Sequence, residues 1–123
     1  MNILAMILVG IVALEHIVIM LLEMFFMESK IAKRSFRLPE HLQKDPSVKV
    51  MFANQGLYNG FLAAGLIWGL MLGSNTVGYM IQLFFILCVL IAAVFGGVTS
   101  NKSIIIKQGL PALLAFIALM LAI

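Results

Sequence analysis

Four long runs of apolar residues alternate with three polar connections along the chain. The runs cover residues 3–27, 50–72, 77–98 and 104–123. Each has about the 20 residues that an α-helix needs to cross the hydrocarbon core of a bilayer. The pattern predicts an all-α fold, a polytopic membrane protein built as a four-transmembrane-helix bundle, with residues 1–123 forming a single integral membrane domain.

The composition supports lipid as the main solvent. Hydrophobic residues make up 63% of the chain and charged residues 11%, whereas soluble domains are about half apolar and a quarter charged. These values exclude an ordinary soluble globule and a disordered segment. Cys88 is the only cysteine, so a disulfide scaffold within one chain is excluded as well.

The basic residues predict the orientation of the spans. Seven of the eight Lys and Arg lie in the first and third connections, and Lys107 lies in the first turn of the fourth span. An even alternation of four spans places all of them on one side. By the positive-inside rule that side is the cytoplasm, so both termini lie outside and residues 28–49 form a cytoplasmic basic loop. Within this loop, Pro39 precedes a short interfacial turn of helix at residues 40–42. The net charge of +3 is therefore a topology signal, and no nucleic-acid partner is expected.

Three ionisable residues interrupt the first span: Glu15, His16 and Glu23. A charge at mid-membrane costs roughly 2.5–3.5 kcal/mol on insertion scales, so such residues are functional candidates. At 100° per residue, one broad helix face carries all three. The opposite face is expected to meet lipid, and its members include Met6, Val9, Val12, Ile17 and Leu21.

The second span carries a matching polar cluster at four-residue steps: Asn54, Gln55, Tyr58 and Asn59. Counted from the cytoplasmic ends, Glu23 and Asn54 both lie roughly 6–8 Å deep, and His16 and Asn59 both lie about 15 Å deep. Antiparallel spans would therefore set acid against amide at one level and imidazole against amide at the next. In the same span, Gly56 and Gly60 begin a series of small residues that admits a close neighbour.

Two interpretations compete for these seven polar residues. In the first, a protonated glutamate bonds an amide and holds helices together. In the second, which we favour, they line a cavity open to the cytoplasmic leaflet. Glu15, His16 and Glu23 would then handle protons and are the candidates for any catalytic role, while Asn54, Gln55, Tyr58 and Asn59 would orient a ligand.

Metal, cofactor and enzyme signatures are absent from the sequence. The trio of Glu15, His16 and Glu23 is a poor ligand set because its first two members diverge by 100°, so no metal site and no cofactor are expected. No nucleophile-elbow, P-loop, zincin or dinucleotide-binding motif is present. Whether the protein is an enzyme stays open.

Two sequence phrases resemble the signature segments of a known family. They are ALEH at residues 13–16, continued by LEMF at 22–25, and ANQGLYNGFLAAG at 53–65. Both phrases, the length, the four spans and the basic first loop are similar to domain of unknown function 1304, a family of small bacterial integral membrane proteins. The resemblance implies a four-helix protein of the bacterial cell membrane and supplies no reaction.

We therefore expect a multi-pass protein of the bacterial cytoplasmic membrane that binds a small lipophilic molecule, and that acts on it or moves it, at a polar pocket near the inner leaflet. One alternative is a proton-coupled exporter like the small multidrug resistance proteins, which have similar length and an acidic residue in the first span. A further alternative is a structural or partner-binding membrane subunit. A homo-oligomer is expected because one such bundle has little interior.

Overall fold

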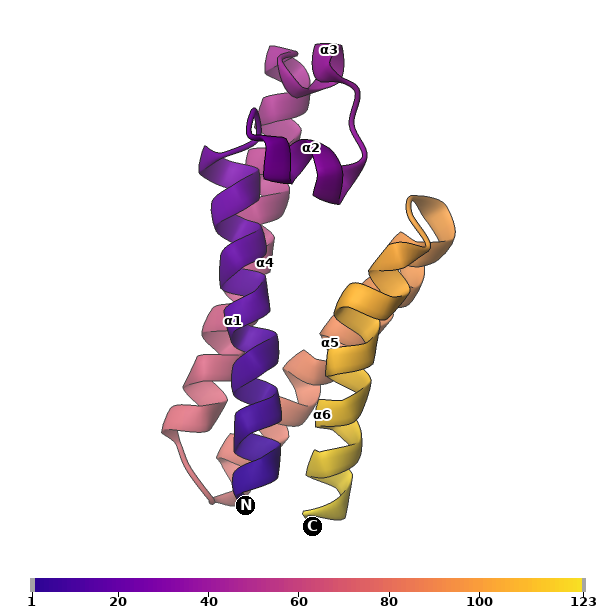
Figure 1. The fold of residues 1–123 in the computed structure, drawn as a ribbon. Helices are drawn as coiled ribbons and strands as arrows, with labels where there is room; N and C mark the ends of the chain where they lie inside the picture. The colour runs from indigo at the N-terminus through magenta and orange to yellow at the C-terminus, as the bar shows by residue number, and fades with distance from the viewer. Residues whose placement is uncertain (1, 123) are drawn as a thin grey trace. The chain divides into compact units, whose positions relative to one another are not determined.

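The computed structural model describes residues 2–122, which are almost entirely helical. About 85% of the chain is helix, and no strand occurs among the described residues, which confirms the all-α prediction. The helices are α1 (Ile3–Phe25), α2 (Lys30–Phe36), α3 (Glu40–Gln43), α4 (Pro46–Met71), α5 (Thr76–Thr99), the π-helical turn η1 (Ile105–Gly109) and α6 (Leu110–Leu121) (Figure 1).

Two of these helices, α1 and α5, are long and apolar enough to cross a membrane. The apolar helix Ile105–Leu121 is shorter. α4 has ample length at 26 residues, but its amides and glycines make it less apolar than the other two. Membrane association is thus supported by two helices, and the four-span arrangement stays a prediction.

The chain divides into two compact units, and α1 and α4 each contribute to both. We call the first the apolar unit; it comprises the residues up to Glu15 and those from Leu62 onward. The second, the polar unit, comprises His16–Phe61. It contains the second half of α1, all of α2 and α3, and the first part of α4.

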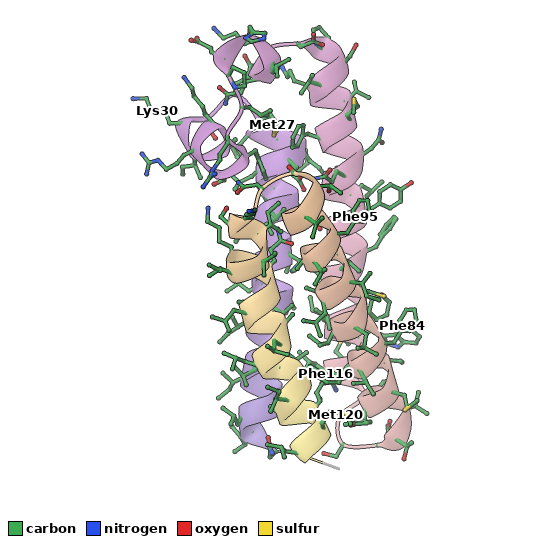
Figure 2. All side chains as sticks on the ribbon, turned by 90° about the vertical axis from the view of Figure 1, so that its right-hand side faces the viewer. Met27, Lys30, Phe84, Phe95, Phe116 and Met120 are labelled. Carbon is green, nitrogen blue, oxygen red and sulfur yellow. The ribbon has the colours of Figure 1, made fainter. Side chains whose placement is uncertain are left out.

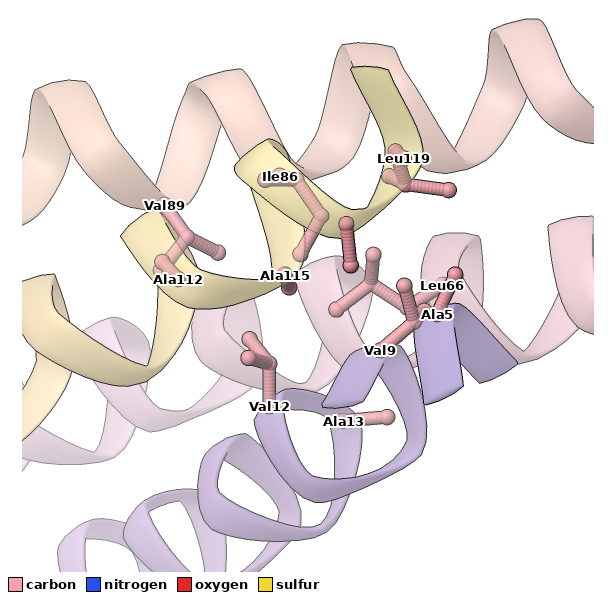
Figure 3. Packing of buried hydrophobic residues seen from close by; sticks show 11 residues of the cluster. Ala5, Val9, Val12, Ala13, Leu66, Ile86, Val89, Ala112, Ala115 and Leu119 are labelled. Atoms are coloured by element: carbon pink, nitrogen blue, oxygen red, sulfur yellow. The ribbon is translucent and has the colours of Figure 1, made fainter. Parts of the chain in front are cut away.

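The core of the apolar unit is built from small and β-branched side chains. Ala112, Ala115 and Leu119 recur at three- and four-residue steps on α6, and all three are fully buried. They belong to one cluster with Ile86 and Val89 of α5, shown in Figure 3. Alanine at these steps removes side-chain bulk and so permits helices to approach closely where lipid supplies little hydrophobic drive.

The lipid-facing surface predicted for α1 is wrong at two positions. Val9 and Val12 are fully buried and belong to the same core cluster, whereas Met6 and Leu21 are exposed as expected. The error has a physical cause. In a chain whose core and lipid-facing side chains are equally apolar, the hydrophobic pattern does not tell a helix contact from a lipid contact.

The connection between α1 and α4 is folded into helices, where the sequence predicted a loop with one helical turn. Ser29 caps α2 because its Oγ accepts a hydrogen bond from the backbone N–H of Ala32 at 3.1 Å. Arg37 ends α2 in the left-handed conformation, with φ of 52°. Pro39 then caps α3, which confirms the predicted turn. The second apolar run was predicted to begin at residue 50, whereas α4 begins four residues earlier, at Pro46. Asp45 caps this earlier start, because its Oδ1 accepts a hydrogen bond from the backbone N–H of Ser47 at 2.8 Å.

Gln43 ties this connection to the end of α1. It is 3% exposed, and its Nε2 donates to the carbonyl oxygens of Met27 at 2.9 Å and Ser29 at 3.0 Å. Replacement by leucine leaves the Met27 carbonyl without this donor, while the Ser29 carbonyl keeps the backbone N–H of Lys33 at 3.1 Å. The substitution is expected to lower the free energy of unfolding by about 1–3 kcal/mol. Thermal unfolding followed by circular dichroism measures this loss. The control His41→Leu, at an exposed position of the same short helix, should change stability by less than about 0.5 kcal/mol, and an equal loss in both variants contradicts the role of Gln43.

Candidate functional site

A buried carboxylate held by two amides lies inside the polar unit. Glu23 of α1 is fully buried. Its Oε2 accepts a hydrogen bond from Gln55 Nε2 at 2.5 Å, and its Oε1 accepts one from Asn59 Nδ2 at 2.6 Å. Both carboxyl oxygens act as acceptors, and both amide groups act as donors. We call these three residues the Glu23 cluster.

Helix periodicity and two glycines explain why the cluster forms. Gln55 and Asn59 are four residues apart on α4, so both amides lie on the same helix face. Between and beside them, Gly56 and Gly60 leave room for α1. A Cβ at Gly56 would lie 2.9 Å from Glu23 Cβ, and one at Gly60 would lie 2.6 Å from Met20 Sδ. The small-residue series predicted in this span therefore does admit a close neighbour, and that neighbour carries the glutamate.

The partners of Glu23 differ in part from the prediction. Glu23 does contact amides of α4, and these are Gln55 and Asn59. The depth count from the sequence predicted Asn54 instead. The depth count assumed that both helices end at the same level. In the structure α1 ends at Phe25 and α4 begins at Pro46, so α4 extends further and its contact residues are shifted along the chain.

The remaining predicted site residues are not part of the Glu23 cluster. Asn54 and Tyr58 are exposed, and the Tyr58 ring packs edge-on against Phe61 at a centroid distance of 5.8 Å. His16 is 1% exposed within the polar unit. Glu15 belongs to the apolar unit, where its Oε1 is buried without a hydrogen-bond partner in the described chain. A single site made of all seven residues stays a prediction.

A cavity of about 240 Å³ lies at the C-terminal end of α1, within the polar unit. Its walls combine acidic, basic and apolar side chains: Glu23, Met24, Phe25, Phe26, Met27, Glu28, Ser29 and Lys49. The sequence interpretation included Glu23 only. Glu28 and Lys49 lie in the segment that the sequence predicts as a loop outside the membrane. They are 21 residues apart, and the folding of α2 and α3 brings them together.

Two acidic side chains and one basic side chain line the cavity: Glu23, Glu28 and Lys49. Lys49 Nζ lies 2.8 Å from Glu28 Oε2, and this hydrogen bond, reinforced by the lysine charge, lowers the pKa of Glu28, which therefore stays ionised at neutral pH. Lys49 thus neutralises one of the two glutamates. The C-terminal carbonyl groups of α1 add the partial negative charge of a helix end.

Comparison with known proteins yields a family and one curated relative. The model of the family described as "Protein of unknown function (DUF1304)" matches residues 10–120. The chain is similar to the "Uncharacterized protein YpaA" of Lactococcus lactis subsp. lactis (strain IL1403), with 41% identity over 118 residues, which cover 96% of this chain and 98% of that protein. No solved structure shows a significant match.

Proposed function

This chain belongs to the DUF1304 family of proteins of unknown function, and we propose that it is a multi-pass membrane protein that binds a small lipophilic cation in the cavity at the end of α1. One observation carries the proposal. The cavity joins apolar walls to two acidic side chains and one basic side chain, and it lies at the end of α1, a helix long and apolar enough to cross a membrane.

The proposed topology has both termini outside a bacterial cell membrane and the polar connection of residues 28–49 in the cytoplasm. The apolar helices α1 and α5 support membrane insertion. Seven of the eight basic residues lie in two connections and the eighth, Lys107, lies in the span turn that follows one of them, which supports the orientation. In this arrangement the cavity opens at the cytoplasmic leaflet, where a ligand can enter from the lipid.

The size and walls of the cavity define the ligand class. At about 240 Å³ the cavity is smaller than the ~300–1,000 Å³ of ordinary ligand pockets. It therefore accommodates the polar head and the first carbons of a ligand whose tail stays in lipid. Met24 and Met27 are flexible apolar side chains, which adapt to tails of different shape. A primary amine on an alkyl chain fits this description.

The Glu23 cluster supplies the charge that selects a cation. Gln55 and Asn59 are neutral donors, so their hydrogen bonds stabilise the Glu23 carboxylate without cancelling its charge. Within residues 2–122 no lysine or arginine forms an ion pair of 4 Å or less with Glu23. A ligand ammonium group in the adjoining cavity would supply the missing positive charge.

Binding of octylamine tests the proposal directly. Titrated into the detergent-solubilised protein, octylamine should bind saturably and raise the melting temperature, whereas octanol and octanoate should not. Glu28→Gln removes one cavity charge and leaves Lys49 unpaired, so it should weaken octylamine binding by about fivefold or more. Glu40→Gln is the matched control because Glu40 is also exposed and paired to a lysine, Lys44 at 3.0 Å, but lies outside the cavity.

Two results of the octylamine titration would overturn the proposal. Equal affinity for octylamine and octanol shows that the cavity does not select charge. An equal effect of Glu28→Gln and Glu40→Gln assigns binding to the net charge of the protein surface. Either result contradicts a cation site at the end of α1.

A further inference from the structure

Four basic side chains form a stripe along one face of α2 and its C-cap. Lys30, Lys33, Arg34 and Arg37 follow one another at steps of three, one and three residues, the spacing of a helix face. All four are exposed, and Lys30 extends away from the ribbon in Figure 2. We call these four residues the basic stripe. The opposite side of α2 is packed, since Ala32 is fully buried and the Phe36 ring lies 5.2 Å from that of Phe52.

The basic stripe differs from the other lysines of the same unit in forming no direct ion pair, although the charge of Lys33 helps to lower the pKa of Glu40. Lys44 pairs with Glu40 and Lys49 pairs with Glu28. Within the described chain, no ion pair of 4 Å or less involves a residue of the stripe. Four positive charges on less than two turns of helix repel one another, so they gain most from an external anion.

Exposed apolar side chains adjoin the stripe in the sequence. Phe25 is 65% exposed, Phe26 56% and Ile31 63%. Aromatic and aliphatic side chains beside lysine and arginine are the composition of a segment that lies in a membrane interface. α2 begins only five residues after α1 ends, so the stripe lies at the bilayer surface if α1 crosses the membrane.

We propose that the basic stripe binds the phosphate groups of anionic phospholipids in the leaflet that the C-terminal end of α1 reaches. The inference uses the membrane insertion of α1 from the proposed function, but not its cavity or its ligand. Charge complementarity selects the anionic headgroup, and Phe25, Phe26 and Ile31 insert among the acyl chains beside it. The stripe thereby fixes the depth of the polar unit in the membrane.

The test compares two lipids with the same acyl chains, one with an anionic and one with a zwitterionic headgroup. The full-length protein in a zwitterionic detergent is titrated with dioctanoyl phosphatidylglycerol and with dioctanoyl phosphatidylcholine, and binding is followed by microscale thermophoresis. Wild-type protein should prefer phosphatidylglycerol by at least tenfold. Each surface cation contributes about fivefold to binding of an anionic lipid, so Lys33→Gln/Arg34→Gln should lose more than tenfold in affinity.

The control variant Lys102→Gln/Lys107→Gln removes the same charge from exposed positions of the apolar unit and should keep the wild-type preference. Equal losses in the two double variants, or displacement of the lipid by millimolar inorganic phosphate, overturn the proposal. The single variant Lys30→Gln, expected to lose about fivefold, covers the case in which the double variant fails to fold. Octylamine binding is a separate measurement and should be unchanged in Lys33→Gln/Arg34→Gln. Failure of the cavity proposal and failure of the basic-stripe proposal therefore give different results.

Discussion

Glu23→Leu should lower the free energy of unfolding by about 2–5 kcal/mol. The substitution leaves the amide N–H groups of Gln55 and Asn59 without the acceptors that they now contact at 2.5 and 2.6 Å. Gln55 is exposed and Asn59 is half-buried, and a hydrogen bond to a carboxylate contributes about 1.5–3 kcal/mol. Equilibrium unfolding in mixed micelles with increasing SDS, followed by circular dichroism, measures the difference.

Two further variants separate hydrogen bonding from packing. Glu23→Gln keeps an acceptor and nearly the same volume, so it should lose less than half as much stability as Glu23→Leu. The triple variant Glu23→Leu/Gln55→Leu/Asn59→Leu removes donors and acceptor together and should recover part of the loss, because no polar group is then left unpaired. Additive losses across these variants would contradict a coupled cluster.

Gly56→Leu should lower the free energy of unfolding by more than about 3 kcal/mol. Already at the Cβ atom, a side chain at this position would lie 2.8 Å from Met24 Cγ and 2.9 Å from Glu23 Cβ. Overpacking of this kind costs about 1–3 kcal/mol, and more when backbone must move. Gly56→Ala should fall in the lower range and Gly56→Leu above it, and both should weaken octylamine binding because α1 carries the cavity walls.

Gly10→Ala provides the matched control for this prediction. Gly10 lies within the same helix as Glu23, and nothing lies within 4 Å of a Cβ placed there. Because alanine is the better helix former, this substitution should be neutral or should stabilise the protein by about 0.5–1 kcal/mol. Equal destabilisation by Gly10→Ala and Gly56→Ala would contradict the close approach of α1 and α4 at Gly56.

Helix type and approximate bounds follow from the hydrophobic pattern alone. Residues 3–27 and 77–98 were predicted as apolar helices and are observed as Ile3–Phe25 and Thr76–Thr99. The contact between Glu23 and the amides of α4 was also predictable in kind, because a buried acid needs donors and Gln55 and Asn59 share a helix face. Which amides it meets depended on where each helix ends.

The cavity and the folded connection could not be predicted from periodicity. α2 and α3 are too short to give a clear hydrophobic period, and they depend on tertiary contacts such as those of Gln43. Glu28 and Lys49 belong to the cavity because these short helices return the chain to the end of α1. The burial of Val9 and Val12 could not be predicted from the sequence for a different reason: lipid and a protein core select the same apolar side chains.

Methionine methyl resonances test the central claim, a cation-selective cavity at the end of α1, most directly. Met24 and Met27 line the cavity, whereas Met71 and Met80 are 80% and 56% exposed in the apolar unit. With ¹³C-methyl-labelled methionine in the detergent-solubilised protein, octylamine should shift the Met24 and Met27 signals saturably and leave Met71 and Met80 unchanged, and octanol should shift neither pair. Equal, unsaturable shifts of all four methyl groups with both compounds would contradict the account.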